Sequence, residues 1–128
     1  MDIATPAGNL TVINTHIDAS GADTYRLQEA RTLATIVKEA RVQHAHVLLG
    51  GDLNSTPEST VQQNLRASDL RDAWTECGRG DGLTFPADSA VKRIDYVLMA
   101  DGLKCTGAEV RKTRVSDHLP LIVEIVIP

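Results

Sequence analysis

Several side chains in this 128-residue sequence could act on a phosphate ester, and each lies near the end of an expected strand. The carboxylate of Asp52 can orient or deprotonate an attacking water molecule. The amide of Asn54 can donate to a phosphoryl oxygen. A His118–Asp95 pair would stabilise charge on the phosphate, and Asp117 offers the hard oxygen ligand that suits Mg²⁺. Together these residue types are suited to the hydrolysis of phosphate esters.

Two strands and the helix between them would position the first of these residues. Residues 10–17 alternate and are rich in β-branched types, and residues 46–50 form a short apolar run, so both are predicted to be strands. Apolar residues recur at helical spacing between them, which predicts a helix over 24–43. Strands joined in this way are parallel and end at one edge of the sheet, where ligand sites of α/β sheets lie. That edge would carry His16, Asp52 and Asn54.

Three further strands are expected toward the C-terminus. Residues 93–99 and 103–112 predict a hairpin around the turn Asp101-Gly102, and residues 120–127 predict the last strand. If 93–99 runs antiparallel to the first two strands, it begins at their shared edge, and the loop before the last strand returns there. The edge would therefore also carry Asp95 and one or both of Asp117 and His118.

The order of elements predicts one α/β domain over residues 1–128, with a mixed sheet. The long helix would take Asp23 or Thr24 as its N-cap. A shorter helix over about 57–66 would have Pro57 at its first position. Both helices together can cover one face of the sheet.

Composition excludes some classes of function. A net charge of −4 argues against a protein that coats nucleic acid through bulk charge. No apolar run of about 18 residues is present, so no membrane span is expected. Cys77 and Cys105 are far apart in sequence and are interpreted as idle thiols rather than a disulfide, with a reducing cytoplasm as the default location.

Four stretches carry a resemblance to a known family. They are NTHID (14–18), GGDLNSTPES (50–59), KRIDYVLM (92–99) and SDHLPL (116–121). In this order they resemble motifs of the endonuclease/exonuclease/phosphatase superfamily, which includes deoxyribonucleases, abasic-site endonucleases, sphingomyelinases and inositol-phosphate phosphatases. The resemblance covers nearly the whole chain. It implies that the chain corresponds to the C-terminal half of a four-layer α/β/β/α sandwich.

The resemblance implies roles for four catalytic residues. Asp52 resembles the carboxylate that positions the nucleophilic water, and Asn54 resembles its phosphate-contacting neighbour. His118 resembles the catalytic histidine, and Asp95 resembles its carboxylate partner.

Further residues follow from the same motifs. Asp117 resembles the carboxylate on the metal side. His16 resembles a histidine that acts as an acid or phosphate ligand in the deoxyribonuclease-like and sphingomyelinase-like branches, which makes an abasic-site endonuclease less favoured. Asn14 in the first motif, with Arg111 and Arg114 before the last, are candidate contacts to an anionic substrate, although a solvated loop explains the arginines equally well.

The resemblance also implies a missing part. Family members begin with another half that supplies an asparagine and the glutamate that is the principal Mg²⁺ ligand. Glu29, Glu39 and Glu58 lie in the wrong motif context to replace it, and Glu29 and Glu39 are expected on a solvated helix face. We therefore expect a Mg²⁺- or Mn²⁺-dependent phosphoester hydrolase with weak or no turnover as this chain alone. The alternative is a catalytically inactive remnant that binds a phosphorylated ligand or a protein.

The apolar strands suggest a partner. Residues 46–50 and 120–127 have the pattern of strands covered on both faces, whereas two helices cover about one face. A homodimer packed sheet on sheet, or a separate complementary half, would cover the other. The remaining alternative is that residues 67–92 fold back over the sheet.

Overall fold

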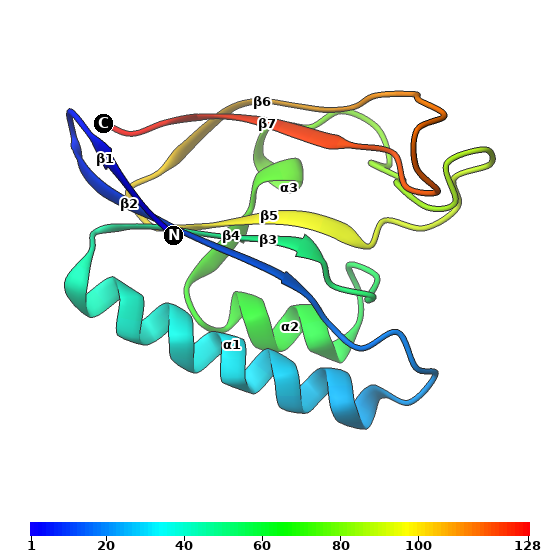
Figure 1. The fold of residues 1–128 in the computed structure, drawn as a ribbon, viewed down its shortest axis with the longest axis horizontal. Helices are drawn as coiled ribbons and strands as arrows, with labels where there is room; N and C mark the ends of the chain where they lie inside the picture. The colour runs from blue at the N-terminus through cyan, green and yellow to red at the C-terminus, as the bar shows by residue number, and fades with distance from the viewer.

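A five-stranded mixed sheet forms the middle layer of the computed structural model, which describes residues 1–128 (Figure 1). Strands β2 and β3 are parallel, and every other neighbouring pair is antiparallel. The strand order is β1 (Asp2–Thr5), β2 (Gly8–His16), β3 (His46–Asp52), β5 (Asp95–Ala100) and β4 (Leu70–Asp72).

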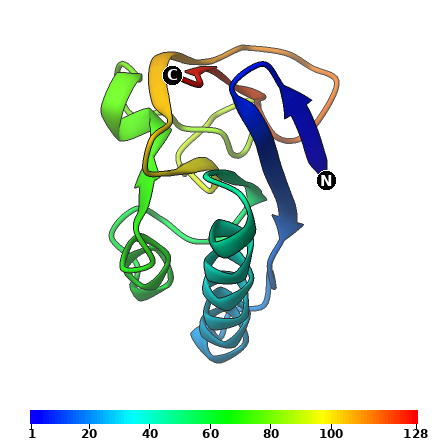
Figure 2. The same cartoon turned by 90° about the vertical axis from the view of Figure 1, so that its left-hand side faces the viewer.

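Two helices cover one face of this sheet, α1 (Asp23–Gln43) and α2 (Thr60–Arg66) (Figures 1 and 2). Helix α1 buries Ala30, Leu33 and Val37, which recur at helical spacing and therefore share one face. They join a core with the inward-facing residues of β3 and β5, such as Val47 and Leu98. None of the helices is long and apolar enough to cross a membrane.

A separate two-stranded sheet, β6 (Lys104–Val110) and β7 (Leu121–Val126), covers the opposite face (Figure 1). The short helix α3 (Ala73–Cys77) lies beside it. A second apolar cluster fills this side, with Met99 and Leu103 at its centre and Leu48, Val97 and Val123 packed against it. The expected α/β fold with a mixed sheet is confirmed, and the chain forms three layers by itself.

The expected hairpin between 93–99 and 103–112 is wrong. The turn at Asp101-Gly102 forms, since the Leu103 amide donates to the Ala100 carbonyl at 3.4 Å. However, β5 pairs with β3 along one edge and with β4 along the other. Because both edges of β5 are occupied, β6 leaves the sheet and pairs with β7 in the second layer.

The bare sheet face that motivated a homodimer is absent from the fold. Val123 and Ile125 of β7 pack onto the second apolar cluster, so the last strand covers the sheet instead of extending it. The outward side of β7 carries Glu124 and Val126, and 48% of Val126 is exposed. Coverage within one chain thus removes the physical reason for a second copy on that face.

The helix starts also differ from expectation. The N-cap of α1 is Ala22, which has no capping side chain, and Asp23 is the first helical residue. Helix α2 begins at Thr60 with Ser59 as its N-cap, whose hydroxyl accepts from the Gln62 amide at 3.3 Å. Pro57 therefore precedes α2, because the serine provides the stronger cap.

The two cysteines form a disulfide, which contradicts the expectation of idle thiols. Cys77 ends α3 and Cys105 lies in β6, with 5.8 Å between their Cα atoms. That spacing suits a disulfide. The bond also removes the basis for assuming a reducing cytoplasm, where disulfides are rare.

Candidate active site

The register of three neighbouring strands places three polar residues in one row. His16, the last residue of β2, is paired with Asp52, the last residue of β3. Asp52 is in turn paired with Asp95, the first residue of β5. The row arises because parallel strands end where the antiparallel strand begins. It lies at the end of the sheet from which the loops carrying residues 53–59 and 111–120 also extend (Figure 1).

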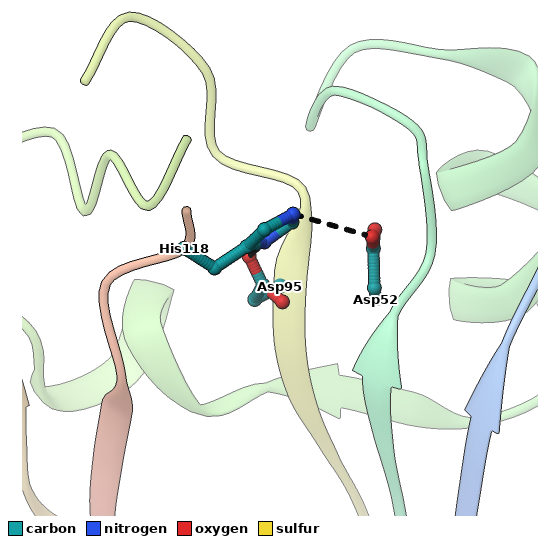
Figure 3. Close-up of side chains that lie close together, drawn as sticks. All are labelled: Asp52, Asp95 and His118. Carbon is teal, nitrogen blue, oxygen red and sulfur yellow. Dashed lines mark hydrogen bonds and ion pairs between the residues drawn. The ribbon is translucent and has the colours of Figure 1, made fainter. Parts of the chain in front are cut away.

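His118 joins this row from the loop before β7 (Figure 3). Its Nδ1 lies 2.8 Å from Oδ2 of Asp95, and its Nε2 lies 3.7 Å from Oδ2 of Asp52. On the other side of Asp52, Nε2 of His16 lies 3.5 Å from the same oxygen. Asp52 is thus flanked by two imidazoles, one of which is held by a second carboxylate.

The charges around His118 favour its protonated form. Burial acts to lower the pKa of His118, but the hydrogen bond to Asp95 and the negative charges of Asp95, Asp52 and Asp117 outweigh it. The net result is a pKa above the ordinary value for histidine. At neutral pH the site therefore presents a larger share of imidazolium than a free histidine would.

This shift predicts that the His118–Asp95 pair stabilises the fold mainly in acid solution. A folded-state pKa above the unfolded one gives stabilisation that is complete below the unfolded pKa, about 6.5, and is lost as the pH rises through the folded pKa. We expect Asp95→Asn to lower the free energy of unfolding by about 1 kcal/mol at pH 5.5, with a smaller loss at pH 8.5. Urea unfolding at both values measures this. Asp81→Asn is the control, and its effect on stability should be the same at both pH values. An equal loss at both pH values in Asp95→Asn would contradict the prediction.

The loop over 83–92 holds His118 in place. The ring of Phe85 lies 4.8 Å from the imidazole, centroid to centroid. The Leu119 amide donates to the Thr84 carbonyl at 2.8 Å, and the Ala87 amide donates to the Asp117 carbonyl at 2.7 Å. Sequence reasoning missed Thr84 and Phe85, because nothing in their local pattern indicates which distant loop they contact.

Asn54 connects the ends of β2 and β3. Its backbone amide donates to Oδ1 of Asp52 at 2.9 Å, and its side-chain Nδ2 donates to the Ile17 carbonyl at 2.9 Å. The Ile17 amide donates back to the Asp52 carbonyl at 3.0 Å. These bonds fix the carboxylate of Asp52, and they occupy one of the two side-chain N–H groups expected to face a phosphate.

Gly51 is required where β2 and β3 approach each other. Its φ is +130°, and a Cβ at this position would lie 1.8 Å from the Thr15 carbonyl oxygen. Any side chain would push the strands apart one residue before Asp52. The strand predicted over 46–50 thus extends to Asp52, and the Gly50-Gly51 pair lies within it and sets its distance from β2.

Glu29 is more than a surface residue of α1, which corrects the expectation of a solvated face. Its Oε2 accepts a hydrogen bond from the Asp18 amide at 2.7 Å, and the residue is half-buried. Asp18 lies two residues after His16, so Glu29 holds the loop that follows β2. The glutamate positions the rim of the site from the helix beneath it.

One group of side chains fits a divalent cation. Asp52, Asp95 and His118 each offer a ligand atom, and these atoms lie within 4.8 Å of one another. Two carboxylates and an imidazole suit Mn²⁺ and, through their oxygens, Mg²⁺. Asp117 is outside this group; its side chain is exposed and accepts from the Ser116 hydroxyl.

The candidate substrate contacts occupy different places. Asn14 lines a cavity of about 480 Å³ that Asp95 and His118 also line. Arg114 lines a larger open groove on the other side of the loop, together with Asp117. Arg111 lines neither, because its guanidinium is paired with Glu109 at 2.6 Å. Of the three, only Asn14 shares a cavity with Asp95 and His118.

Comparison with known proteins identifies the family. Residues 1–118 match the model of the Endonuclease/Exonuclease/phosphatase family. The chain belongs to this family. No curated protein matches the sequence.

Solved members of the endonuclease/exonuclease/phosphatase fold confirm the architecture. A conserved protein of unknown function from Enterococcus faecalis is 23% identical with a TM-score of 0.80, over 94% of this chain and 51% of that one. Bacteroides thetaiotaomicron mannosyl-6-phosphatase is 21% identical with a TM-score of 0.80, over 92% and 51%. The catalytic domain of human Nocturnin, with bound sulfate, is 17% identical with a TM-score of 0.78, over 94% and 48%. This chain spans about half the length of these proteins, and at such identities the likeness concerns the fold.

Proposed function

We propose that this chain carries the catalytic histidine and carboxylates of a divalent-metal-dependent phosphoester hydrolase. The observation that carries the proposal is the placement of His118 between Asp95 and Asp52 at the ends of paired strands. A histidine fixed by one carboxylate beside a second carboxylate can stabilise a phosphate while the second group acts on water. Membership of the endonuclease/exonuclease/phosphatase family supports the same reaction class.

Each residue has a role in this proposal. Asp52 orients the attacking water and accepts its proton, since its carboxylate is fixed by the Asn54 amide. His118, held protonated by Asp95, stabilises the negative charge that develops on the phosphoryl oxygens. His16 acts on the other side of Asp52, as an acid or as a phosphate ligand.

The substrate would be held from the rim of the site. Asn14 is exposed and shares the cavity with His118, so it can donate to a phosphoryl oxygen. Arg114 is exposed next to the loop that carries His118 and can meet an anionic group of a nucleic acid, phospholipid or small phosphate ester. Arg111 would first have to leave Glu109.

A divalent cation would be held by the carboxylates of Asp52 and Asp95, and Asp117 is a further proposed ligand. The imidazole of His118 is a ligand only in its neutral form, so in its protonated role it lies beside the cation without binding it. Bound there, the cation would supply positive charge to the phosphoryl oxygens, which is worth several kcal/mol in phosphoryl chemistry. Mg²⁺ is the favoured ion because all of these proposed ligands are carboxylates.

The proposal predicts a measurable metal site in this chain. Calorimetric titration with Mn²⁺ should give one site, and Asp52→Asn should weaken it by about tenfold or more, because a carboxylate ligand is lost. Asp81→Asn is the matched control, since Asp81 is exposed and is not part of the group of close ligand atoms. Equal affinity in the wild type and Asp52→Asn would contradict the metal site and favour the alternative below.

The second candidate is a catalytically inactive domain that binds a phosphorylated ligand or a protein. It is favoured by the position of Asp117, the proposed carboxylate on the metal side, which is exposed and lies outside the group of close ligand atoms. An active unit would then need a complementary half, either a separate chain or a second copy of this one. Light scattering separates a 13.8 kDa monomer from a dimer.

A further inference from the structure

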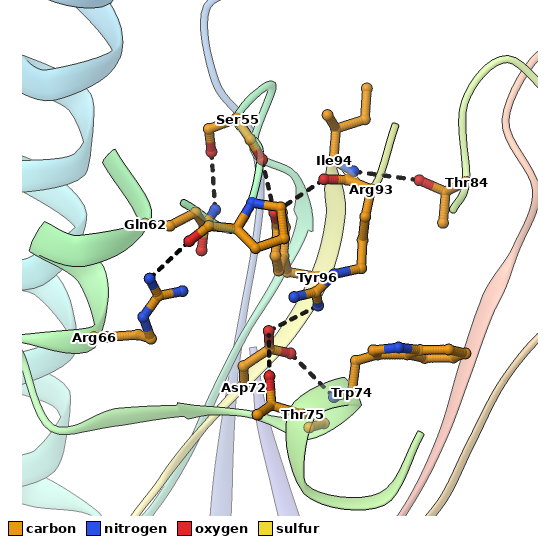
Figure 4. A network of polar contacts seen from close by, with 12 residues as sticks. Ser55, Gln62, Arg66, Asp72, Trp74, Thr75, Thr84, Arg93, Ile94 and Tyr96 are labelled. Atoms are coloured by element: carbon orange, nitrogen blue, oxygen red, sulfur yellow. Dashed lines mark hydrogen bonds and ion pairs between the residues drawn. The ribbon is translucent and has the colours of Figure 1, made fainter. Parts of the chain in front are cut away.

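A buried ion pair lies directly behind the start of β5 (Figure 4). Nη1 of Arg93 lies 2.7 Å from Oδ2 of Asp72, and these side chains are 8% and 3% exposed. The guanidinium carbon also lies 4.8 Å from the ring centroid of Tyr96. Buried charges are retained only where they are paired and hydrogen-bonded, so this contact fixes Arg93 in one orientation.

Asp72 is itself held in place. It is the N-cap of α3, and its side chain accepts from the Trp74 amide at 3.0 Å and from the Thr75 hydroxyl at 3.2 Å (Figure 4). The N-terminus of α3 thus orients the carboxylate that pairs with Arg93. Removing either charge would leave its partner buried and uncompensated.

The hydroxyl of Tyr96 connects two segments that each carry a carboxylate of the site. It lies 2.7 Å from the Ser55 carbonyl oxygen and 3.0 Å from the Arg93 carbonyl oxygen (Figure 4). Both of these partners are carbonyl oxygens, which only accept, so the hydroxyl acts as the donor. Ser55 is three residues after Asp52, and Tyr96 directly follows Asp95.

A backbone bond joins the same two segments. The Leu53 amide donates to the Ile94 carbonyl at 2.8 Å. Leu53 directly follows Asp52, and Ile94 directly precedes Asp95, so this bond ties the two carboxylate-bearing segments together beside the site. Among the side chains, only that of Tyr96 spans from β5 to the loop after Asn54 in this network.

We propose that Tyr96, supported by the Asp72–Arg93 pair, is a positioning residue that sets the separation of Asp52 from the Asp95–His118 pair. The inference rests on the proposed phosphoester hydrolysis for its functional meaning. Tyr96 touches none of the reacting groups. It acts by holding the loop after β3 against the start of β5, where a displacement of about 1 Å can cost roughly 10²-fold in rate.

Hydrogen exchange of backbone amides, followed by NMR, tests this in the full chain. Tyr96→Phe removes only the hydroxyl and keeps the ring beneath Arg93. Exchange of the Leu53 and Ile17 amides, which bond to Ile94 and Asp52, is expected to be about tenfold faster, because local opening loses one buried hydrogen bond. The amide of Val37 in α1 should keep its rate.

The control variant is Tyr25→Phe, which removes a hydroxyl from a side chain that is exposed on α1. It should leave all three amides unchanged. Unchanged exchange at Leu53 and Ile17 in Tyr96→Phe overturns the proposal. Equal acceleration at Val37 overturns it too, because Tyr96 would then serve global stability alone. If Tyr96→Phe does not fold, Thr75→Val, which removes one hydrogen bond to Asp72 and keeps both charges of the pair, should give a weaker form of the same selective pattern, and unchanged exchange in that variant overturns the proposal.

Kinetics supply a second readout. Where turnover is measurable, Tyr96→Phe should lower kcat by about tenfold and leave KM within about twofold, since the substrate contacts remain. An unchanged kcat overturns the proposal. Absence of turnover in every variant, the wild type included, contradicts the proposed hydrolysis, and the exchange rates then still decide the positioning role.

Discussion

Replacing His118 by alanine is expected to lower phosphodiester hydrolysis by about 10²- to 10⁴-fold, the contribution typical of one positioned acid–base group. The histidine is the one side chain that contacts both Asp95 and Asp52, at 2.8 and 3.7 Å. Its removal would leave two carboxylates facing the phosphate without the compensating positive charge. The wild-type rate itself is expected to be low, so the assay should use an activated aryl phosphodiester with Mg²⁺ or Mn²⁺ and a long time course.

The control for this variant is His44→Ala. His44 follows α1, near the start of β3, whereas Asp52 ends that strand. Its loss should leave the rate within about twofold, as is usual for a surface change away from the site. Similar rates for His118→Ala and wild type would show that hydrolysis does not use the proposed site.

The row of strand-end residues could be predicted because it depends on connectivity alone. A strand, a helix and a second strand fix two parallel strand ends at one edge, so His16 and Asp52 must be neighbours. The same reasoning placed Asp95 at this edge if its strand ran antiparallel, and the structure pairs it with Asp52. Here the order of the strands and the helix in the sequence determines which strand ends lie side by side, and therefore where the side chains at those ends lie.

The second layer could not be predicted, because it depends on which strand edges are free. The Asp101-Gly102 turn is a strong hairpin signal, yet β4 occupies the edge of β5 that β6 would need. Strand β4 has only three residues, too few to give a pattern of its own. Residues 120–127 were expected to form a strand of the main sheet covered on both faces. They instead form β7 of the second sheet, which packs one side on the main sheet and leaves Glu124 and Val126 exposed on the other.

The supporting polar residues were also beyond sequence reasoning. Arg93 and Asp72 are of types that usually lie at the surface, and only tertiary packing buries them as a pair. Glu29 has the same ambiguity, since a charged residue on a helix is most often solvated. Its bond to the Asp18 amide depends on the path of the loop between β2 and α1. The local sequence does not indicate contacts between residues that are far apart in the chain.

Loss of the Cys77–Cys105 disulfide is expected to lower the free energy of unfolding by about 3–4 kcal/mol. In the loop-entropy account, cross-linking residues 28 apart in sequence restricts the unfolded chain by this amount. For a domain of this size, that corresponds to a fall in Tm of about 10 °C. Thermal and urea unfolding of the wild type, with and without a thiol reductant, measures the effect.

The double variant Cys77→Ala/Cys105→Ala is the control for this experiment, because its stability should match the reduced wild type and be insensitive to reductant. Wild-type stability that is unaffected by complete reduction would contradict the prediction. The bond joins α3 to β6, and the N-cap of α3 is Asp72, the partner of Arg93. Reduction should therefore loosen the second layer first, and amide exchange in β6 should accelerate more than exchange in α1, which packs on the opposite face of the sheet.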